Sequence, residues 1–267
     1  MSLVKTYLIP HGDEILSFPN QESRKMNGSI SKETKGDPCV SFPRTKGDPS
    51  ETVLIISPHS LRIPSGLPVV NTQYLSGKYE IGKNILKGDY ETDRNLNSDL
   101  IKKSKHFVEV NFVTTTGKLS TFPADFGTLI PLTFFCNKRV SMLGQWRTPR
   151  RDLLIDLGKK LYDVVLKSDR KISVVFSADQ AHTHSRTGPY GFDGRAKKYD
   201  KMVERAIRTN AFDELVSLDD EYLDGAKPDS YWNLLMYHGF TERGKLTPKF
   251  HYYYLQEYFG MLFATAE

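Results

Sequence analysis

Three apolar runs in the chain lead into a histidine: residues 4–10 into His11, 53–58 into His59 and 172–181 into His182. Short runs rich in β-branched residues and bounded by Pro or small residues are typical of buried strands in a parallel or mixed sheet. Open α/β sheets bind ligands beyond the carboxyl ends of their strands. We therefore expect the three imidazoles to meet at one edge of a sheet.

The rest of the pattern predicts further strands and helices. Aromatic and β-branched residues indicate strands at 106–113, 139–146, 250–255 and 259–264. Apolar residues at helical spacing indicate a helix from about 152 to 167, and shorter helices are expected at about 196–208 and 230–238. This alternation predicts an α/β protein with a central mixed sheet flanked by helices.

A polar stretch at about 18–51 interrupts the pattern. It is rich in Ser, Lys, Gly, Asp and Pro, and predicts a long surface loop. Thr-Lys-Gly-Asp-Pro occurs in it twice, at 34–38 and 45–49, and each copy predicts a turn. A chain of 267 residues with this single interruption is expected to form one domain over residues 1–267.

Charge and composition narrow the function classes. The net charge of +5 and the pI near 9.0 arise from scattered Lys and Arg, which suits a small anionic substrate and argues against nucleic acid. Cys39 and Cys136 lack the spacing of zinc ligands. No run approaches the roughly 18 apolar residues of a membrane span, so we expect no membrane association and a cytoplasmic location.

The histidines suggest specific chemistry. Two histidines and one carboxylate leave three open positions on a metal, an arrangement that suits non-heme Fe(II). His11 and His59 are candidate ligands, although any one histidine is more often structural. His182 begins a polar Gly/Pro-rich loop, where an imidazole suits general acid/base work. His184 would share that pocket, point away, or chelate a metal together with His182.

At this point the sequence resembles a family. Pro-His near the N-terminus, Ser-Pro-His at 57–59, Ser-Ala-Asp-Gln-Ala-His at 177–182, Gly-Pro-Tyr-Gly-Phe-Asp at 188–193 and Phe-Gly-Met-Leu-Phe-Ala at 259–264 occur in this order. The pattern is similar to the class III extradiol ring-cleavage dioxygenases, the superfamily of the catalytic subunit of protocatechuate 4,5-dioxygenase. The resemblance covers most of the chain outside the polar stretch and implies a LigB-like fold.

The resemblance also implies a site. It assigns one Fe(II) to His11, His59 and a late carboxylate, for which we choose Asp229, and it makes His182 the acid/base histidine. Asp229 would equally serve as an N-cap of the following helix. Members usually carry Glu or His at the third ligand, so Ser230, Glu221 and Glu14 stay as alternatives. Phe126 stands where a pocket histidine is common.

The implied reaction opens the ring of a catechol with O₂. Both diol oxygens would chelate the Fe(II), His182 would assist proton transfer, and the ring would open beside the diol. A substrate carboxylate would pair with a nearby cation, and His184 and Arg186 are our candidates, with Arg62 as a third.

Two rival functions remain. Zn(II) accepts the same ligand types, so a zinc-dependent hydrolase in the same pocket is the first rival. A non-enzymatic binding or signalling protein of the same fold is the second, although the presence of His182 beside both ligand histidines favours an enzyme. A homo-oligomer is compatible with the aromatic segment at 252–254, which buried strand packing would explain as well.

Overall fold

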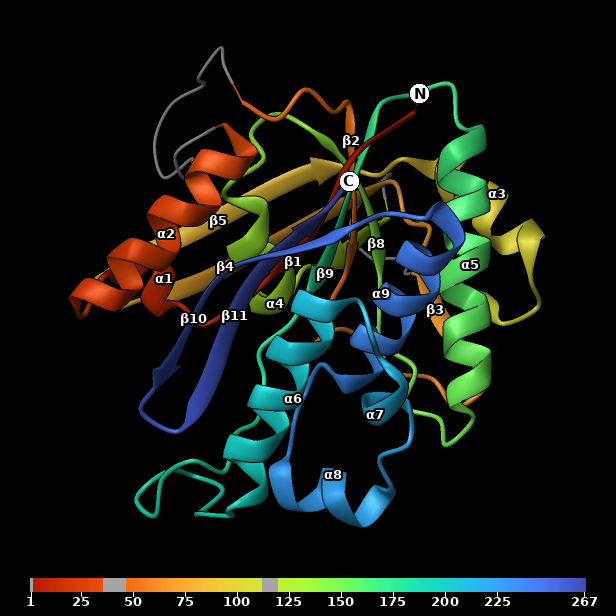
Figure 1. The fold of residues 1–267 in the computed structure, drawn as a ribbon. Coiled ribbons are helices and arrows are strands. Elements are labelled where there is room, and N and C mark those ends of the chain that lie inside the picture. The colour runs from red at the N-terminus through yellow and green to blue at the C-terminus, as the bar shows by residue number, and fades with distance from the viewer. Residues whose placement is uncertain (1, 36–46, 112–119) are drawn as a thin grey trace.

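The computed structural model describes residues 2–35, 47–111 and 120–267, and these residues form a mixed eight-stranded sheet in the order β10-β11-β1-β9-β2-β8-β3-β6 (Figure 1). A smaller sheet has the order β5-β4-β7. The strands are β1 Leu3–Ile9, β2 Thr52–Ile56, β3 Leu67–Val70, β4 Tyr74–Ile81, β5 Asn84–Glu91, β6 Phe107–Val110, β7 Thr121–Pro123, β8 Arg139–Leu143, β9 Ile172–Ser177, β10 Pro248–Gln256 and β11 Phe259–Ala266.

Helices cover both faces of the large sheet. They are α1 Glu14–Ser17, α2 Gln21–Thr34, α3 Arg94–Lys103, α4 Phe126–Leu132, α5 Arg151–Lys167, α6 Arg195–Thr209, α7 Asp213–Val216, α8 Asp220–Ala226 and α9 Tyr231–Gly244. The two chain termini lie at one end of the sheet, and α7 and α8 lie at the other (Figure 1). No helix in the described ranges is long and apolar enough to cross a membrane.

Four central strands run in the same direction. β1 pairs in parallel with β9, β9 with β2 and β2 with β8, whereas β11 is antiparallel to β1 and β3 is antiparallel to β8. The carboxyl ends of β1, β9, β2 and β8 therefore meet at one edge, which is where an open α/β sheet binds ligands.

Alternation along these strands divides the core into two layers. Leu8 of β1 packs with α5, α6 and α9 on one face, while Tyr7 and Ile9 pack with α2, α4 and the small sheet on the other. Both faces are buried, which is why these strands read as continuous apolar runs rather than as alternating ones.

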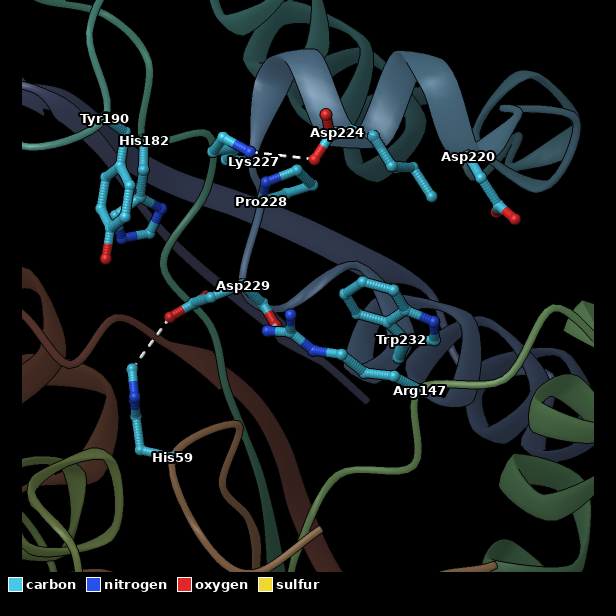
Figure 2. A pocket seen from close by; sticks show the side chains of 11 residues that line it. His59, Arg147, His182, Tyr190, Asp220, Asp224, Lys227, Pro228, Asp229 and Trp232 are labelled. Atoms are coloured by element: carbon cyan, nitrogen blue, oxygen red, sulfur yellow. Dashed lines mark hydrogen bonds and ion pairs between the residues drawn. The ribbon is translucent and has the colours of Figure 1, made fainter. Parts of the chain in front are cut away.

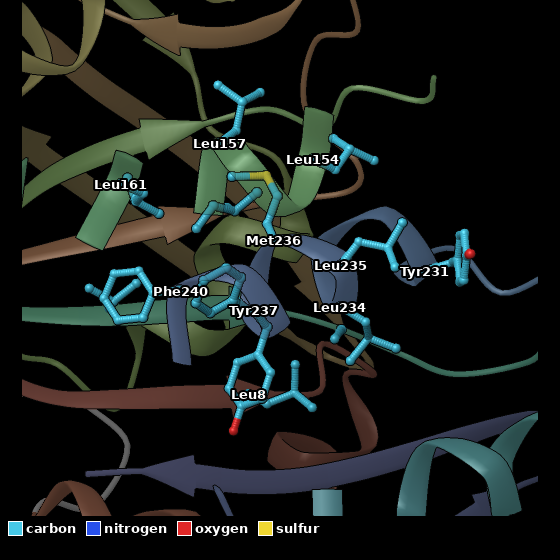
Figure 3. Packing of buried hydrophobic residues seen from close by; sticks show 14 of the residues in the cluster. Leu8, Leu154, Leu157, Leu161, Tyr231, Leu234, Leu235, Met236, Tyr237 and Phe240 are labelled. Carbon is cyan, nitrogen blue, oxygen red and sulfur yellow. The ribbon is translucent and has the colours of Figure 1, made fainter. Parts of the chain in front are cut away.

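The helices α5 and α9 pack closely over the first layer, as Figure 3 shows for their leucines and aromatic residues. Two glycines allow this approach: a Cβ on Gly158 would collide with the carbonyl of Met236, and a Cβ on Gly239 would collide with the carbonyl of Ile155. The long helix predicted at 152–167 is thus present, and its partner is the helix that follows Asp229.

The other predicted elements also occur, with shifted ends. The helices expected at 196–208 and 230–238 are α6 and the longer α9, and the C-terminal pair is the hairpin β10–β11. The strand expected at 139–146 ends at Leu143. The strand expected at 106–113 is β6, and residues 112–113 lie outside the described residues.

The prediction of a loop over residues 18–51 is wrong for its first half, because residues 21–34 form α2. Asn20 and Ser23 form a capping box at its start, and Met26 and Ile30 are buried on its inner face. Such a narrow apolar stripe is enough because only one side of the helix contacts the sheet. Residues 36–46, which include part of each predicted turn, lie outside the described residues.

Candidate metal centre

Each of the four parallel strands leads directly into residues of one site. The segment after β1 carries His11, that after β2 carries His59, that after β9 carries Asp179 and His182, and that after β8 carries Gln145 and Arg147. A fifth segment, between α8 and α9, contributes Asp229. The site is therefore assembled by the parallel arrangement of the sheet.

His11, His59 and Asp229 converge on one point. Nε2 of His11 lies 3.0 Å from Nε2 of His59 and 3.1 Å from Oδ2 of Asp229, and His59 Nε2 lies 3.0 Å from the same oxygen. Across residues 2–35, 47–111 and 120–267, these three form the group of His, Cys, Asp or Glu side chains that could hold a metal ion. All three candidate ligand atoms lie within 4.8 Å of one another.

Hydrogen bonding fixes which nitrogen of His11 faces this point. The Ser177 hydroxyl donates to the carbonyl of Gly127 at 2.6 Å, so its lone pair accepts from Nδ1–H of His11 at 2.9 Å. In the neutral imidazole, this leaves the lone pair on Nε2. Nε2 is the atom directed at His59 and Asp229, and the tautomer therefore suits metal coordination.

Asp229 is held from two sides. Its Oδ1 accepts a hydrogen bond from the buried Ser230 hydroxyl, which also contacts the carbonyl of Asp179, and its own carbonyl accepts from Nε2 of Gln145 at 2.7 Å. Ser230 thus orients the carboxylate and does not face the two histidines. Of the alternative third ligands, Glu221 is exposed, and Glu14 does not join the group.

Asp179 is a second buried carboxylate that the sequence reasoning did not single out. Oδ1 of Asp179 accepts the backbone N–H of His11 at 3.0 Å, and its Oδ2 lies 3.4 Å from His11 Nε2. The available signal was its place directly after a buried strand, in the Ser-Ala-Asp motif. Asp179 thereby fixes the backbone that carries His11.

Charges in the cluster depend on one another. Burial opposes protonation of His11, but Asp179 and Asp229 outweigh it and raise the pKa of His11 to about 9. Burial would also raise the pKa of Asp229, yet His11 and His59 hold it well below its usual range. Burial raises the pKa of Asp179, with His11 acting against it. The two carboxylates thus favour a positive charge at this point.

His182 faces the same region from its loop. Its Nδ1 lies 2.9 Å from the carbonyl of Gln180, which can only accept, so the neutral ring carries its hydrogen on Nδ1 and a lone pair on Nε2. The ring stacks on Phe259 with a centroid distance of 5.4 Å and meets Tyr190 edge-on. These contacts fix the plane of an imidazole whose free nitrogen can accept a proton.

Aromatic residues form the wall beside the histidines. Phe126 lies against His59 with a centroid distance of 4.1 Å and stacks on Tyr79 at 5.3 Å. Phe126 begins α4 at the position where the resemblance leads us to expect a pocket histidine. The Phe126 side chain offers no proton donor or acceptor there.

Two cavities open onto the cluster. One of about 360 Å³ is lined by Asp229, Arg147 and Trp232 (Figure 2), and one of about 220 Å³ is lined by His11, Asp179 and Phe126. His59, His182 and Tyr190 line both cavities. The larger cavity is within the size range of small-molecule sites, which starts at roughly 300 Å³.

The cations predicted to meet a substrate carboxylate lie elsewhere. His184 is turned into the protein and bonds the buried Asp200 at 2.8 Å, with only 6% of its side chain exposed. Arg186 is exposed and lies over the ring of Phe192, and Arg62 donates to the carbonyl of Pro58. The cavity wall instead contains Arg147, which the sequence reasoning missed although it closely follows β8.

Glu14, one of the alternative third ligands, lines the smaller cavity. Its Oε2 is buried and has no hydrogen-bond partner among the described residues, and burial raises the pKa of this carboxyl to about 7. A group with such a pKa gains or loses a proton near neutral pH.

Comparison with known proteins identifies the fold and the family of the chain. A crystal structure of an uncharacterized protein from Escherichia coli K12 matches with a TM-score of 0.62 at 15% identity, covering 99% of this chain and 100% of the other, which supports the shared fold. No curated protein sequence matches the chain. The family model described as the catalytic LigB subunit of aromatic ring-opening dioxygenase matches residues 5–264. The chain therefore belongs to the LigB family of aromatic ring-opening dioxygenase subunits.

Proposed function

We propose that this protein is an extradiol dioxygenase that opens the ring of a catechol-type substrate with O₂ at one ferrous ion. The ion would be held by His11, His59 and Asp229, and His182 would transfer protons. The observation that carries the proposal is the convergence of Nε2 of both histidines and Oδ2 of Asp229 on one point beside a cavity.

The donor set fits ferrous iron. Two imidazole nitrogens and one carboxylate oxygen form the facial triad of non-heme Fe(II) oxygenases, which leaves positions for a chelating substrate and for dioxygen. Asp229 and Asp179 supply negative charge beside the two neutral ligands, so a divalent cation would be electrostatically favoured here. When bound, the iron supplies Lewis acidity and an electron path between the diol and dioxygen.

Neighbouring residues hold the candidate ligand side chains in orientations that suit a metal ion. Ser177 sets the tautomer of His11, Asp179 holds its backbone, and Ser230 turns Oδ2 of Asp229 toward the histidines. Such outer contacts typically affect metal affinity or activity by 10- to 100-fold.

His182 is suited to acid/base work. Its Nε2 lone pair accepts a proton from a substrate hydroxyl, and the same nitrogen returns the proton later in the reaction. Stacking on Phe259 restricts rotation of the ring, so the proton acceptor keeps its direction. The apolar face of Phe126 beside His59 offers a surface for an aromatic ring.

Oxygen uptake tests the proposal. Protein loaded anaerobically with Fe(II) is mixed with a panel of catechols, and consumption of one O₂ per catechol with formation of a yellow ring-opened product is expected. Iron-loaded protein that consumes no oxygen with any catechol would contradict it. Hydrolytic activity of the zinc-loaded protein would favour the hydrolase, and binding of catechols without turnover would favour a binding protein.

A further inference from the structure

Glu14 is an acid of the smaller cavity to which the proposed reaction assigns no role. It begins α1 and lines the cavity of about 220 Å³ together with His11 and His182. Its Oε2 is buried and meets no hydrogen-bond donor of the described residues. A carboxyl oxygen that is left without a donor beside a reaction site is free to accept a proton there.

Close packing places this carboxyl against the backbone that carries His11. A Cβ built on Gly12 would lie 2.7 Å from Oε2 of Glu14 and 2.9 Å from the ring of Phe259. The carboxyl thus occupies the space that a side chain at position 12 would need. His182 stacks on the same Phe259 ring with a centroid distance of 5.4 Å. Glu14 and His182 therefore both lie next to Phe259 at the edge of one cavity.

The surroundings of Glu14 disfavour its charged form. Burial raises the pKa of Glu14 to about 7, a hydrogen bond from its own backbone opposes this, and the acids Asp13, Asp179 and Glu257 add to it. Asp13 is close enough to accept a hydrogen bond from a protonated Glu14, which a charged Glu14 could not donate. A carboxyl in this balance exchanges its proton near neutral pH at little cost, as an acid/base residue requires.

The other titratable groups that face Glu14 are less suited to this exchange. Burial, with a smaller contribution from nearby acids that include Glu14, raises the pKa of Tyr79, Tyr254 and Tyr258, so these phenols keep their protons at neutral pH. Asp179 is occupied by the backbone N–H of His11. Among the described residues around this cavity, Glu14 is thus the carboxyl best placed to exchange a proton.

We propose that Glu14 is a second proton-transfer residue of the site, which takes the proton of one catechol hydroxyl while His182 takes that of the other. The inference rests on the proposed function, because that function brings a diol to the cluster. A diol that binds through both oxygens releases two protons, whereas Nε2 of a neutral His182 has one lone pair.

The proposed transfer conserves protons and electrons. The O–H bond of the substrate hydroxyl breaks, its electron pair stays on the substrate oxygen, and the proton forms an O–H bond with Glu14. The ring-opened product contains both protons of the diol, so Glu14 returns its proton after the ring has opened.

Counting protons separates this role from a structural one. Catechol is titrated into anaerobic Fe(II)-loaded protein by calorimetry in buffers of different ionisation enthalpy, which gives the number of protons released to the buffer. At pH 8 Glu14 starts in its charged form, so the wild type should release up to about one proton fewer than Glu14→Gln. The difference should fall between pH 8 and pH 6, because Glu14 is then protonated before catechol binds. If Glu14 only filled the space beside Gly12, both proteins would release the same number at every pH.

Turnover gives a second measurement. Glu14→Gln should keep its iron and still bind catechol, while kcat falls by roughly 10²-fold, the lower end of the range for a lost acid/base group. Glu14→Asp should recover part of kcat, because it keeps the carboxyl on a shorter side chain.

Glu257→Gln is the matched control. Glu257 is exposed, acts on the pKa of Glu14 and lines neither cavity, so its change should leave the proton count at pH 8 as in the wild type. Equal proton counts in the wild type and Glu14→Gln, a difference that does not vary with pH, loss of iron in Glu14→Gln, or the same change in Glu257→Gln would overturn the inference.

The proton count also separates this inference from the proposed function. Because it needs no turnover, a difference that depends on pH supports the role of Glu14 even if no catechol ring is opened. Catechol that binds with equal proton counts rejects the inference alone. Catechol that does not bind at all would refute the proposed function and this inference together.

Discussion

Oδ2 of the buried Asp200 accepts a hydrogen bond from Nε2 of His184 at 2.8 Å. Oδ1 of the same carboxylate accepts the backbone N–H of Ala181 at 3.0 Å, and Tyr253 donates to Oδ2 at 2.7 Å. Asp200 thus holds the residues on both sides of His182. The histidine that the sequence suggested for substrate contact instead anchors the loop of the proposed acid/base residue.

Asp200→Asn should therefore lower kcat without loss of iron. The change keeps the shape of the side chain but removes the charge that strengthens the bonds to His184 and Tyr253, so His182 loses its fixed position. We expect a fall of roughly 10- to 100-fold, the range found for partners that orient a site residue. Tyr253→Phe, which removes one bond only, should have a smaller effect, and a parallel loss of iron in Asp200→Asn would contradict this role.

Alanine variants should separate metal binding from proton transfer. His11→Ala, His59→Ala and Asp229→Ala should each lose metal and therefore all activity, since each removes a ligand atom of the cluster. His182→Ala should keep iron and bind catechol while turnover falls by about 10²- to 10⁴-fold. Iron content measured beside oxygen uptake checks both statements. His106→Ala is the control, because His106 stacks on Trp146 and lines neither cavity.

Metal affinity should rise with pH. In the metal-free protein the pKa of His11 is raised to about 9, so below that pH the ring is protonated and the ion must displace a proton. One released proton corresponds to an affinity gain of about tenfold per pH unit, up to near pH 9. Competition between the protein and a chelator for Zn(II) at several pH values measures the slope. Asp179→Asn should shift the plateau to lower pH, because Asp179 is the leading cause that raises the pKa, and a flat profile between pH 7 and 8.5 would refute the linkage.

Gly239→Ala should destabilise the fold. The added methyl would strike the carbonyl of Ile155 on α5, and such overpacking typically costs about 1–3 kcal/mol in the free energy of unfolding. Gly28→Ala is the matched change on α2: its Cβ would meet no atom within 4 Å, so helix propensity should raise stability by up to about 1 kcal/mol. Urea unfolding of both variants tests the contrast, and equal effects would show that α5 and α9 can separate without cost.

The site could be located from the sequence because its signal is local. An apolar strand that ends in a histidine is visible in the sequence, and parallel strands bring their carboxyl ends together without further information. His11 and His59 could therefore be predicted as candidate ligands from the sequence. Asp229 needed the family resemblance, since nothing in its neighbourhood reveals that the start of α9 turns toward two strands.

The elements that escaped prediction depend on tertiary contacts. The helix α2 has a polar sequence, and its buried Met26 and Ile30 acquire meaning only against the sheet. Arg147 is one arginine among many until Trp232, from a segment far along the chain, lies beneath it. His184 lies two residues from His182 but points to the opposite side, an orientation that Asp200 decides.

The three candidate ligands are far apart along the chain, with a sequence separation of 218 from His11 to Asp229 and of 170 from His59 to Asp229. Closing such long loops is slow and entropically unfavourable, so we expect the cluster to form late in folding. An ion that binds this cluster has no comparable site in the unfolded chain. Its binding would therefore stabilise the folded state relative to the unfolded one. At a free concentration a hundred times its Kd it would add about 2.7 kcal/mol, so metal supply would govern how long the chain resists heat and proteolysis.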